Sequence, residues 1–109
     1  MERPVRGDVV VVPFPFSDLS ASKRRPALVV ASPRGDLILC QITSQSVRDG
    51  YAVPLDKSSF ASGMLKHDSN IRPNRLFTAD EGLVLYRVGQ LKHEKMIAVI
   101  DAIVHILKE

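Results

Sequence analysis

The chain has 109 residues, of which 45% are hydrophobic and 25% charged, a size and composition that predict one globular domain spanning residues 1–109 rather than a disordered chain. A formal net charge of +3 and a pI near 9.3 suit a polyanionic partner without proving one. With one cysteine, a polar N-terminus and no apolar run of about 18 residues, the sequence argues against a disulfide framework, a secretory signal and a membrane span, and predicts a cytoplasmic protein.

The first half of the chain predicts three buried strands. Residues 9–12 are all valine and are followed by Pro13, which cannot donate to a strand ladder and is expected to end the strand. Two further apolar runs, 27–31 and 37–43, are separated by a Ser-Pro-Arg-Gly-Asp turn, which predicts an antiparallel hairpin. Residues 14–24 read as a long polar loop, and loops of that length are usually functional or disordered.

The second half predicts shorter strands and then a helix. Pro54 makes residues 51–55 an edge strand. We expect a loop over residues 57–63, and the further strand candidates are 64–66, 75–78 (with Pro73 before it) and 83–88. From Met96 to Leu107 apolar residues recur at spacings of three and four, which indicates a C-terminal helix. Together these elements predict a mainly β fold, a small, partly open barrel capped by that helix.

The predicted helix carries a wider apolar stripe than one packing face needs. Ile97 and Val104 lie beside the main stripe. Either the helix is deeply packed, or its second flank contacts another subunit. Deep packing is the simpler interpretation, and we take it as the expectation.

Standard catalytic machinery is missing from the sequence. The three histidines, His67, His93 and His105, are too scattered for a metal motif, and each glycine stands alone rather than in a phosphate-binding loop. Cys40 lies inside an apolar run, which indicates a buried, inert thiol. Any catalysis is therefore expected to use Arg, Lys, Ser, Thr, Asp or His without a metal or other cofactor.

One pair of polar residues is brought together by the predicted hairpin. Arg25 lies at the start of the second strand, where the following proline biases it to an extended conformation, and Thr43 lies at the end of the third. If the two strands are antiparallel neighbours, Arg25 and Thr43 are close together. A guanidinium beside a hydroxyl suits a phosphate group.

Four segments carry a resemblance to a known family: Gly-Asp-Val-Val at 7–10, Arg-Arg-Pro-Ala-Leu-Val at 24–29, Ile-Thr-Ser-Gln at 42–45 and Val-Gly-Gln-Leu at 88–91. In this order they resemble the MazF/PemK (Kid) family of toxin endoribonucleases. The resemblance implies an SH3-like barrel with a C-terminal helix, a homodimer, and metal-independent cleavage of single-stranded RNA to a 2′,3′-cyclic phosphate and a 5′-hydroxyl. It also implies a cognate antitoxin whose acidic, flexible tail covers the RNA site.

Carried over residue by residue, the resemblance makes Arg25 and Thr43 catalytic and no residue a metal ligand. The family has an arginine and an aspartate where this chain has Lys66 and Asp68; lysine cannot make the two-pronged contact of arginine, so phosphate contact is the expectation for Lys66. His67 matches nothing in the family pattern and is expected to be structural or exposed. The predicted substrate-binding residues are Ser44, Gln45, Lys66, Asp68, Arg72, Phe16 and Ser17.

Some alternatives remain open at this level. Phe14 and Phe16 either stack on RNA bases or cap the barrel. A CcdB-like toxin that grips gyrase, or a barrel that binds RNA without cutting it, is the alternative function from another class. Lysine at position 66 also leaves open a relic that has lost its activity.

Overall fold

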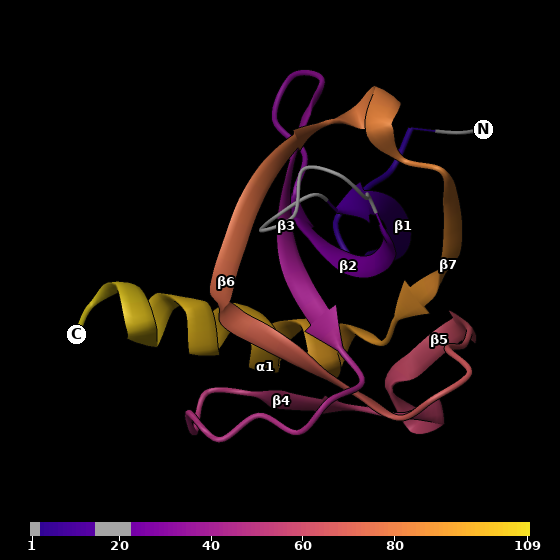
Figure 1. Cartoon of the computed structure of the whole chain (residues 1–109). Coiled ribbons are helices and arrows are strands. Elements are labelled where there is room, and N and C mark those ends of the chain that lie inside the picture. Colours follow the sequence, from indigo (N-terminus) through magenta and orange to yellow (C-terminus); the bar gives the residue numbers. More distant parts are fainter. Residues whose placement is uncertain (1–2, 15–22) are drawn as a thin grey trace.

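The protein folds as one curled antiparallel sheet with a helix packed against it, in a computed structural model that describes residues 3–14 and 23–109 (Figure 1). In these residues the sheet has seven strands in the order β4-β6-β3-β2-β1-β7-β5. This is the mainly β fold, a small half-barrel with a C-terminal helix, that the sequence predicts. The elements are β1 (Asp8–Phe14), β2 (Lys23–Ala31), β3 (Asp36–Thr43), β4 (Val53–Leu55), β5 (Phe60–Gly63), β6 (Ser69–Asp80), β7 (Tyr86–Leu91) and α1 (His93–Leu107), with short 3-10 turns at Lys57–Ser59 and Glu81–Leu83.

The central strands send alternate side chains into two separate hydrophobic cores. Val9 and Leu28 belong to the first core, whereas Val10 and Val29 belong to the second. Successive residues of a strand point to opposite faces, so a strand buried on both faces has no polar position. This explains why β1 and β2 read as unbroken apolar runs rather than as alternating patterns.

The helix α1 covers the first core with one face only. Met96, Val99 and Ile103 are buried there, at spacings of three and four residues. Ile97 follows Met96 and so points about 100° round the helix axis; it is 45% exposed, and Val104 is 41% exposed. The expectation that both are deeply packed is therefore wrong. No helix within residues 3–14 and 23–109 is long and apolar enough to cross a membrane.

The Gly7-Asp8 motif joins three segments of the barrel. Gly7 has φ +98°, and its backbone N–H donates to the carbonyl of Val29 while its carbonyl accepts from Leu91. The side chain of Asp8 is fully buried and accepts from the backbone N–H of Val5 at 2.9 Å. It also accepts from Arg87 on β7 at 3.4 Å. This motif of the family resemblance is thus structural.

The β2–β3 hairpin matches the prediction, and its turn explains why. Arg34 and Gly35 both have positive φ, 39° and 87°, and Asp36 N–H donates to the carbonyl of Pro33 at 2.9 Å. A turn with positive φ at both central residues suits the twist of a hairpin. The edge position of β4, with Pro54 in it, is also as predicted.

Several predicted boundaries are wrong. Strand β1 continues through Pro13, which pairs with Arg24, so Lys23 and Arg24 belong to β2 and not to the loop. Residues 60–63 form strand β5, which pairs with β7, rather than loop, and residues 64–66 form no strand. The last strand begins at Tyr86 and not at residue 83, because Asp80 caps a 3-10 turn by accepting from Gly82 N–H at 2.7 Å.

Strand β6 is one long element where short candidates are predicted. Leu76 pairs with Cys40 of β3, but the next residue of β3, Gln41, pairs with Arg72. Residues 73–75, which include Pro73, therefore form an irregular stretch without partners in this ladder. A proline is tolerated where a ladder is interrupted, because no donor is needed there. In this stretch the thiol of Cys40 donates to the carbonyl of Arg72 at 2.9 Å.

Candidate functional site

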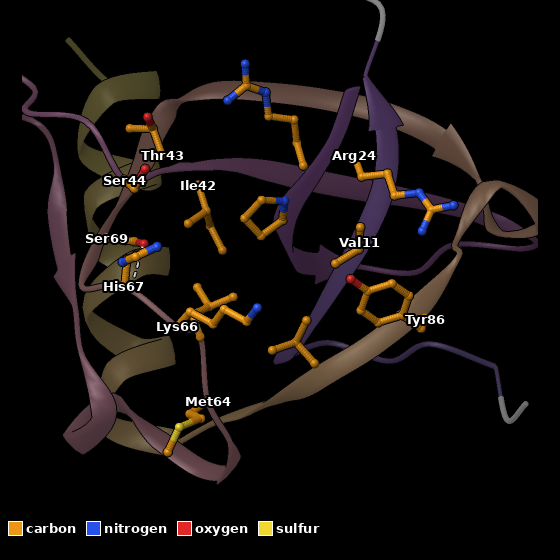
Figure 2. A pocket seen from close by; sticks show the side chains of 14 residues that line it. Val11, Arg24, Ile42, Thr43, Ser44, Met64, Lys66, His67, Ser69 and Tyr86 are labelled. Carbon is orange, nitrogen blue, oxygen red and sulfur yellow. Dashed lines mark hydrogen bonds between the residues drawn. The ribbon is translucent and has the colours of Figure 1, made fainter. Parts of the chain in front are cut away.

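The antiparallel pairing of β2 and β3 brings Arg25 and Thr43 to one cavity. The pairing of β2 with β3 ends at Ala27 and Gln41, so the start of β2, with Arg25, and the end of β3, with Thr43, lie at the same end of the sheet. Both residues line a cavity of about 500 Å³ at this end of the sheet (Figure 2). Strand order predicts that Arg25 and Thr43 lie at one end of the hairpin, and both residues line this cavity. The cavity is lined by Val11, Arg24, Arg25, Pro26, Ile42, Thr43, Ser44, Met64, Leu65, Lys66, His67, Ser69, Tyr86 and Val88.

The cationic side of the cavity comes from β2. Arg25 is half-buried and pairs across the sheet with Val12 of β1, which fixes its backbone on that strand. Pro26, which follows it, fixes its own φ and disfavours a helical conformation for Arg25. Arg24 is exposed at the same rim, on the opposite face of the strand. Both guanidinium groups line the cavity, because it lies at the end of the sheet where β2 begins.

The hydroxyl of Thr43 is held with its proton available. Thr43 Oγ1 accepts a hydrogen bond from the backbone N–H of Gln45 at 3.1 Å. Asn70 of β6 pairs with Thr43, and its side chain donates to the carbonyl of Gln45 at 3.2 Å, which fixes the turn that follows β3. A hydroxyl that accepts one hydrogen bond can still donate its own proton to an anionic oxygen.

Residues 64–67 form another wall, and their position depends on a close crossing of two strands. Gly63, with φ +72°, pairs with Gly89 of β7 so tightly that a Cβ on it would overlap the Val88 carbonyl. Immediately beyond it, Lys66 and His67 reach the cavity. The hydroxyl of Ser69 donates to the carbonyl of His67 at 2.9 Å and secures the far end of this segment.

Not all predicted site residues reach this cavity. Asp68 and Gln45 are exposed nearby but are not among the residues that line it. Arg72 lies elsewhere on β6: its guanidinium pairs with Asp49 at 2.9 Å, and the hydrogen bond from Arg72 lowers the pKa of Asp49. Phe16 and Ser17 lie outside the described residues, as does the side chain of Phe14.

Other lining residues escape prediction from sequence. Arg24 is adjacent to the predicted Arg25 and belongs to the densest cationic cluster, so its charge could have revealed it. Tyr86 and Met64 carry no local signal, because only the register of β7 and the crossing at Gly63 bring them here. In Figure 2, Arg24 and Tyr86 lie at one end of the cavity, Thr43, Ser44 and His67 at the other, and Lys66 between them.

The chemistry of the lining suits an anion. Among the described residues that line the cavity, three carry cationic side chains, Arg24, Arg25 and Lys66, and none carries a carboxylate. Hydroxyls of Thr43 and Ser44 add hydrogen-bond donors. Within the described part of the chain, no group of three or more His, Cys, Asp or Glu side chains could hold a metal ion. Fixed guanidinium and hydroxyl groups of this kind recognise phosphate oxygens.

The single cysteine takes no part in this site. Cys40 is fully buried in the first core, and burial raises the pKa of its thiol to about 12. Since the thiolate is the reactive form, this cysteine is chemically inert in the folded protein. The prediction of a buried thiol is confirmed.

Comparisons with known proteins agree on one family and one fold. Residues 5–107 match a family described as PemK-like, MazF-like toxin of type II toxin–antitoxin system. A crystal structure of MazF from Deinococcus radiodurans has a TM-score of 0.77 at 18% identity and covers 100% of each chain. An endoribonuclease in complex with its cognate antitoxin from a mycobacterial species has a TM-score of 0.76 at 15% identity and covers 96% of this chain and 95% of that one. The Mycobacterium tuberculosis toxin MazF-mt6 has a TM-score of 0.73 at 16% identity, and the match covers 93% of this chain and 96% of that one. No curated protein sequence gives a significant match.

Proposed function

Since this chain belongs to the PemK-like, MazF-like toxins of type II toxin–antitoxin systems, we propose that it cleaves single-stranded RNA at the cavity between β2, β3 and residues 64–67. The observation that carries the proposal is that Arg25 and Thr43 line one cavity together with Arg24 and Lys66, and that the described lining residues include no carboxylate. A cationic lining of this kind attracts the RNA backbone. We assign this activity to the cytoplasm.

The proposed reaction uses a nucleophile from the substrate itself. The ribose 2′-oxygen attacks the adjacent phosphorus, the O2′–P bond forms, and the bond from phosphorus to the 5′-oxygen breaks. The products are a 2′,3′-cyclic phosphate and a 5′-hydroxyl. Negative charge accumulates on the non-bridging oxygens as the reaction proceeds. Arg25 binds these oxygens in two-pronged fashion, and Thr43 donates a hydrogen bond to one of them.

Preorganised donors of this kind carry much of the rate enhancement. One donor aimed at the developing charge is worth about 3–4 kcal/mol in comparable sites. Arg25 is held by its pairing with Val12 of β1, and the Thr43 hydroxyl is oriented by the Gln45 N–H. Neither group needs to be reorganised when the charge forms, which supports a catalytic rather than a purely binding role.

The two proton transfers need a group that exchanges protons near neutral pH. Histidine is the side-chain type with that property. His67 lines the cavity beside Lys66, whereas Asp68 does not line it. We therefore assign both proton transfers to His67, which accepts the proton of the 2′-hydroxyl and donates a proton to the departing 5′-oxygen. Lys66 contacts the backbone phosphate. The sequence predicts a structural or exposed His67; its side chain is exposed, and the proposal adds a catalytic role to that position.

The proposed partners follow from the same surfaces. The cationic cavity suits the acidic tail of a cognate antitoxin, which would compete with RNA for Arg24, Arg25 and Lys66. One similar structure is an endoribonuclease with its cognate antitoxin, which supports such a partner here. The exposed flank of α1, with Ile97 and Val104, supports a homodimer through that face.

The test uses purified protein and a long single-stranded RNA, first to locate a cleavage site by sequencing 5′ ends. A short oligonucleotide with that site is then made in two forms, all-ribose and with one 2′-deoxy nucleotide at the scissile position. We expect cleavage of the first form only, in the presence of EDTA, with a 2′,3′-cyclic phosphate and a 5′-hydroxyl as ends. Equal cleavage of the deoxy form would overturn the mechanism, and tight binding without cleavage would favour a non-catalytic binder.

A further inference from the structure

The cavity has a floor formed by one row of neighbouring residues across the sheet. Tyr86 of β7 pairs with Val11 of β1, and Val11 pairs with Pro26 of β2. The β2–β3 register continued by one residue sets Ile42 opposite Pro26. Directly paired residues point to the same face, and all four line the cavity. The floor is thus an apolar strip that runs from Ile42 to Tyr86.

Tyr86 is an aromatic side chain that the core of the protein does not use. It is 48% exposed, and neither hydrophobic core includes it. Its ring lies against the apolar strip beside Val11, while the rim at this end carries the exposed guanidinium of Arg24 (Figure 2). A half-exposed ring with a cation above an apolar floor leaves one ring face for a flat ligand.

The distance along the strip separates this feature from the catalytic end. Three strand spacings of about 4.8 Å lie between β7 and β3, so Tyr86 is roughly 14 Å from Ile42 across the sheet. One nucleotide step cannot span that length in a strand whose bases remain stacked, since stacked steps rise about 3.4 Å. A ligand bound at both ends is therefore a chain of several nucleotides.

We propose that Tyr86 and Arg24 form a base-binding subsite that stacks a nucleobase flanking the scissile step, with Arg24 on the phosphate of the same nucleotide. The proposal rests on the proposed function for the identity of the ligand as single-stranded RNA. Aromatic rings bind unpaired bases by stacking, and arginine adds charge and its own planar surface. An acidic peptide would also contact Arg24, but its carboxylates do not use the exposed ring, whereas a nucleobase stacks on it.

The amino-acid composition offers a direct probe of this subsite. The chain has no tryptophan and two tyrosines, Tyr51 and Tyr86. Tyr51 lies away from the cavity, where its hydroxyl donates to Glu109 at 3.0 Å. In a Tyr51→Phe variant, which keeps that ring, all tyrosine fluorescence therefore comes from Tyr86.

The experiment titrates Tyr51→Phe protein with all-deoxy eight-nucleotide strands of each single base, which cannot be cleaved by 2′-hydroxyl attack. Binding is followed by anisotropy of a terminal dye, and stacking by quenching of tyrosine fluorescence. We expect quenching that saturates together with the anisotropy. Saturated anisotropy with unchanged fluorescence, or no binding of any strand, would overturn the subsite.

Substitutions provide the second arm. In the otherwise natural chain, Tyr86→Ala should weaken strand binding roughly 10- to 100-fold, which is the range for loss of one stacked base. Tyr86→Phe should bind like the natural chain. Leu85→Ala is the matched control, because Leu85 is 46% exposed and adjacent but does not line the cavity. Equal weakening by Leu85→Ala and Tyr86→Ala would refute a specific role for the ring.

The outcomes for the subsite and for the enzyme are separable. Quenching with a strand, without cleavage of any RNA, would leave the subsite in place and remove the proposed enzyme activity. If the protein cleaves RNA but its Tyr86 fluorescence does not change when a strand binds, the enzyme activity stands and the subsite is overturned.

Discussion

An alanine at position 63 would test how the strand crossing at Gly63 positions the catalytic wall. Gly63 has φ +72° and pairs with Gly89 of β7. A Cβ built on it would overlap the carbonyl oxygen of Val88 and lie 2.6 Å from the Cα of Gly89. Both are backbone atoms, so relief of the overlap requires a shift of β5 against β7. Residues 64–67 would move with β5.

Two effects set the size of the expected loss in stability. The left-handed backbone conformation costs a residue with a Cβ about 1–2 kcal/mol. Overpacking against neighbouring atoms typically adds about 1–3 kcal/mol. We expect Gly63→Ala to lower the free energy of unfolding by about 3–4 kcal/mol, or Tm by roughly 12–20 °C in a domain of this size.

Gly50→Ala is the matched control, because it isolates the first effect. Gly50 has φ +78°, and a Cβ on it would meet nothing within 4 Å. Gly50→Ala should lower the free energy of unfolding by only about 1–2 kcal/mol. Urea unfolding followed by circular dichroism gives both values, and RNA cleavage is measured at a temperature where both variants are folded. Gly63→Ala should cleave more slowly and Gly50→Ala normally. Equal stability losses in the two variants would show that the crossing is not as tight as described.

Three further predictions concern other parts of the chain. Since burial raises the pKa of the Cys40 thiol to about 12, a thiol reagent at pH 8 should label folded protein at least 100-fold more slowly than protein in urea; equal rates would contradict burial. The hydrogen bond from Arg72 lowers the pKa of Asp49 from 3.8, so the ionised carboxylate stabilises the fold above pH 3.8, and this stabilisation is lost as the pH falls through the lower pKa of the folded state. Asp49→Asn should therefore be less stable than the natural chain at pH 6. If the difference in urea midpoint between the two proteins does not shrink below pH 3.8, the pairing of Asp49 with Arg72 is refuted. Lysine at both Ile97 and Val104 should leave a folded monomer in sedimentation velocity where the natural chain sediments as a dimer, and unchanged sedimentation would exclude this flank of α1 from the interface.

Much of the barrel could be predicted from the sequence because its strongest signals are local. The valine run of β1, the apolar run of β2 and the Pro-Arg-Gly turn before β3 each fix a structure over a few residues. The helix is predictable in the same way, from the spacing of Met96, Val99 and Ile103. Antiparallel order alone then brings Arg25 to Thr43, so the centre of the site follows from short-range patterns.

The rest depends on contacts between distant segments. Strand β5 carries no alternating pattern and exists because its backbone pairs with β7 at Gly63 and Gly89. That crossing aims residues 64–67 at the cavity, so the presence of His67 and the absence of Asp68 from the lining could not be derived from spacing. The position of Tyr86 depends on the register of β7 against β1, which is shifted by an irregularity between Val9 and Val10.

The most direct test of the shared role of Arg25 and Thr43 is a double-mutant cycle on kcat/KM for RNA cleavage. We expect Arg25→Ala to lower kcat/KM by about 10²–10³-fold. Thr43→Val should lower it by about 10–100-fold, because a neutral hydroxyl is a weaker donor than a guanidinium. If both side chains hold the same phosphate, kcat/KM of the double variant falls by clearly less than the product of the two single losses, because Thr43 contributes little once Arg25 is removed. The coupling energy between two groups at one site is typically about 0.5–3 kcal/mol. Losses that multiply without coupling would contradict a single phosphate bound by both side chains.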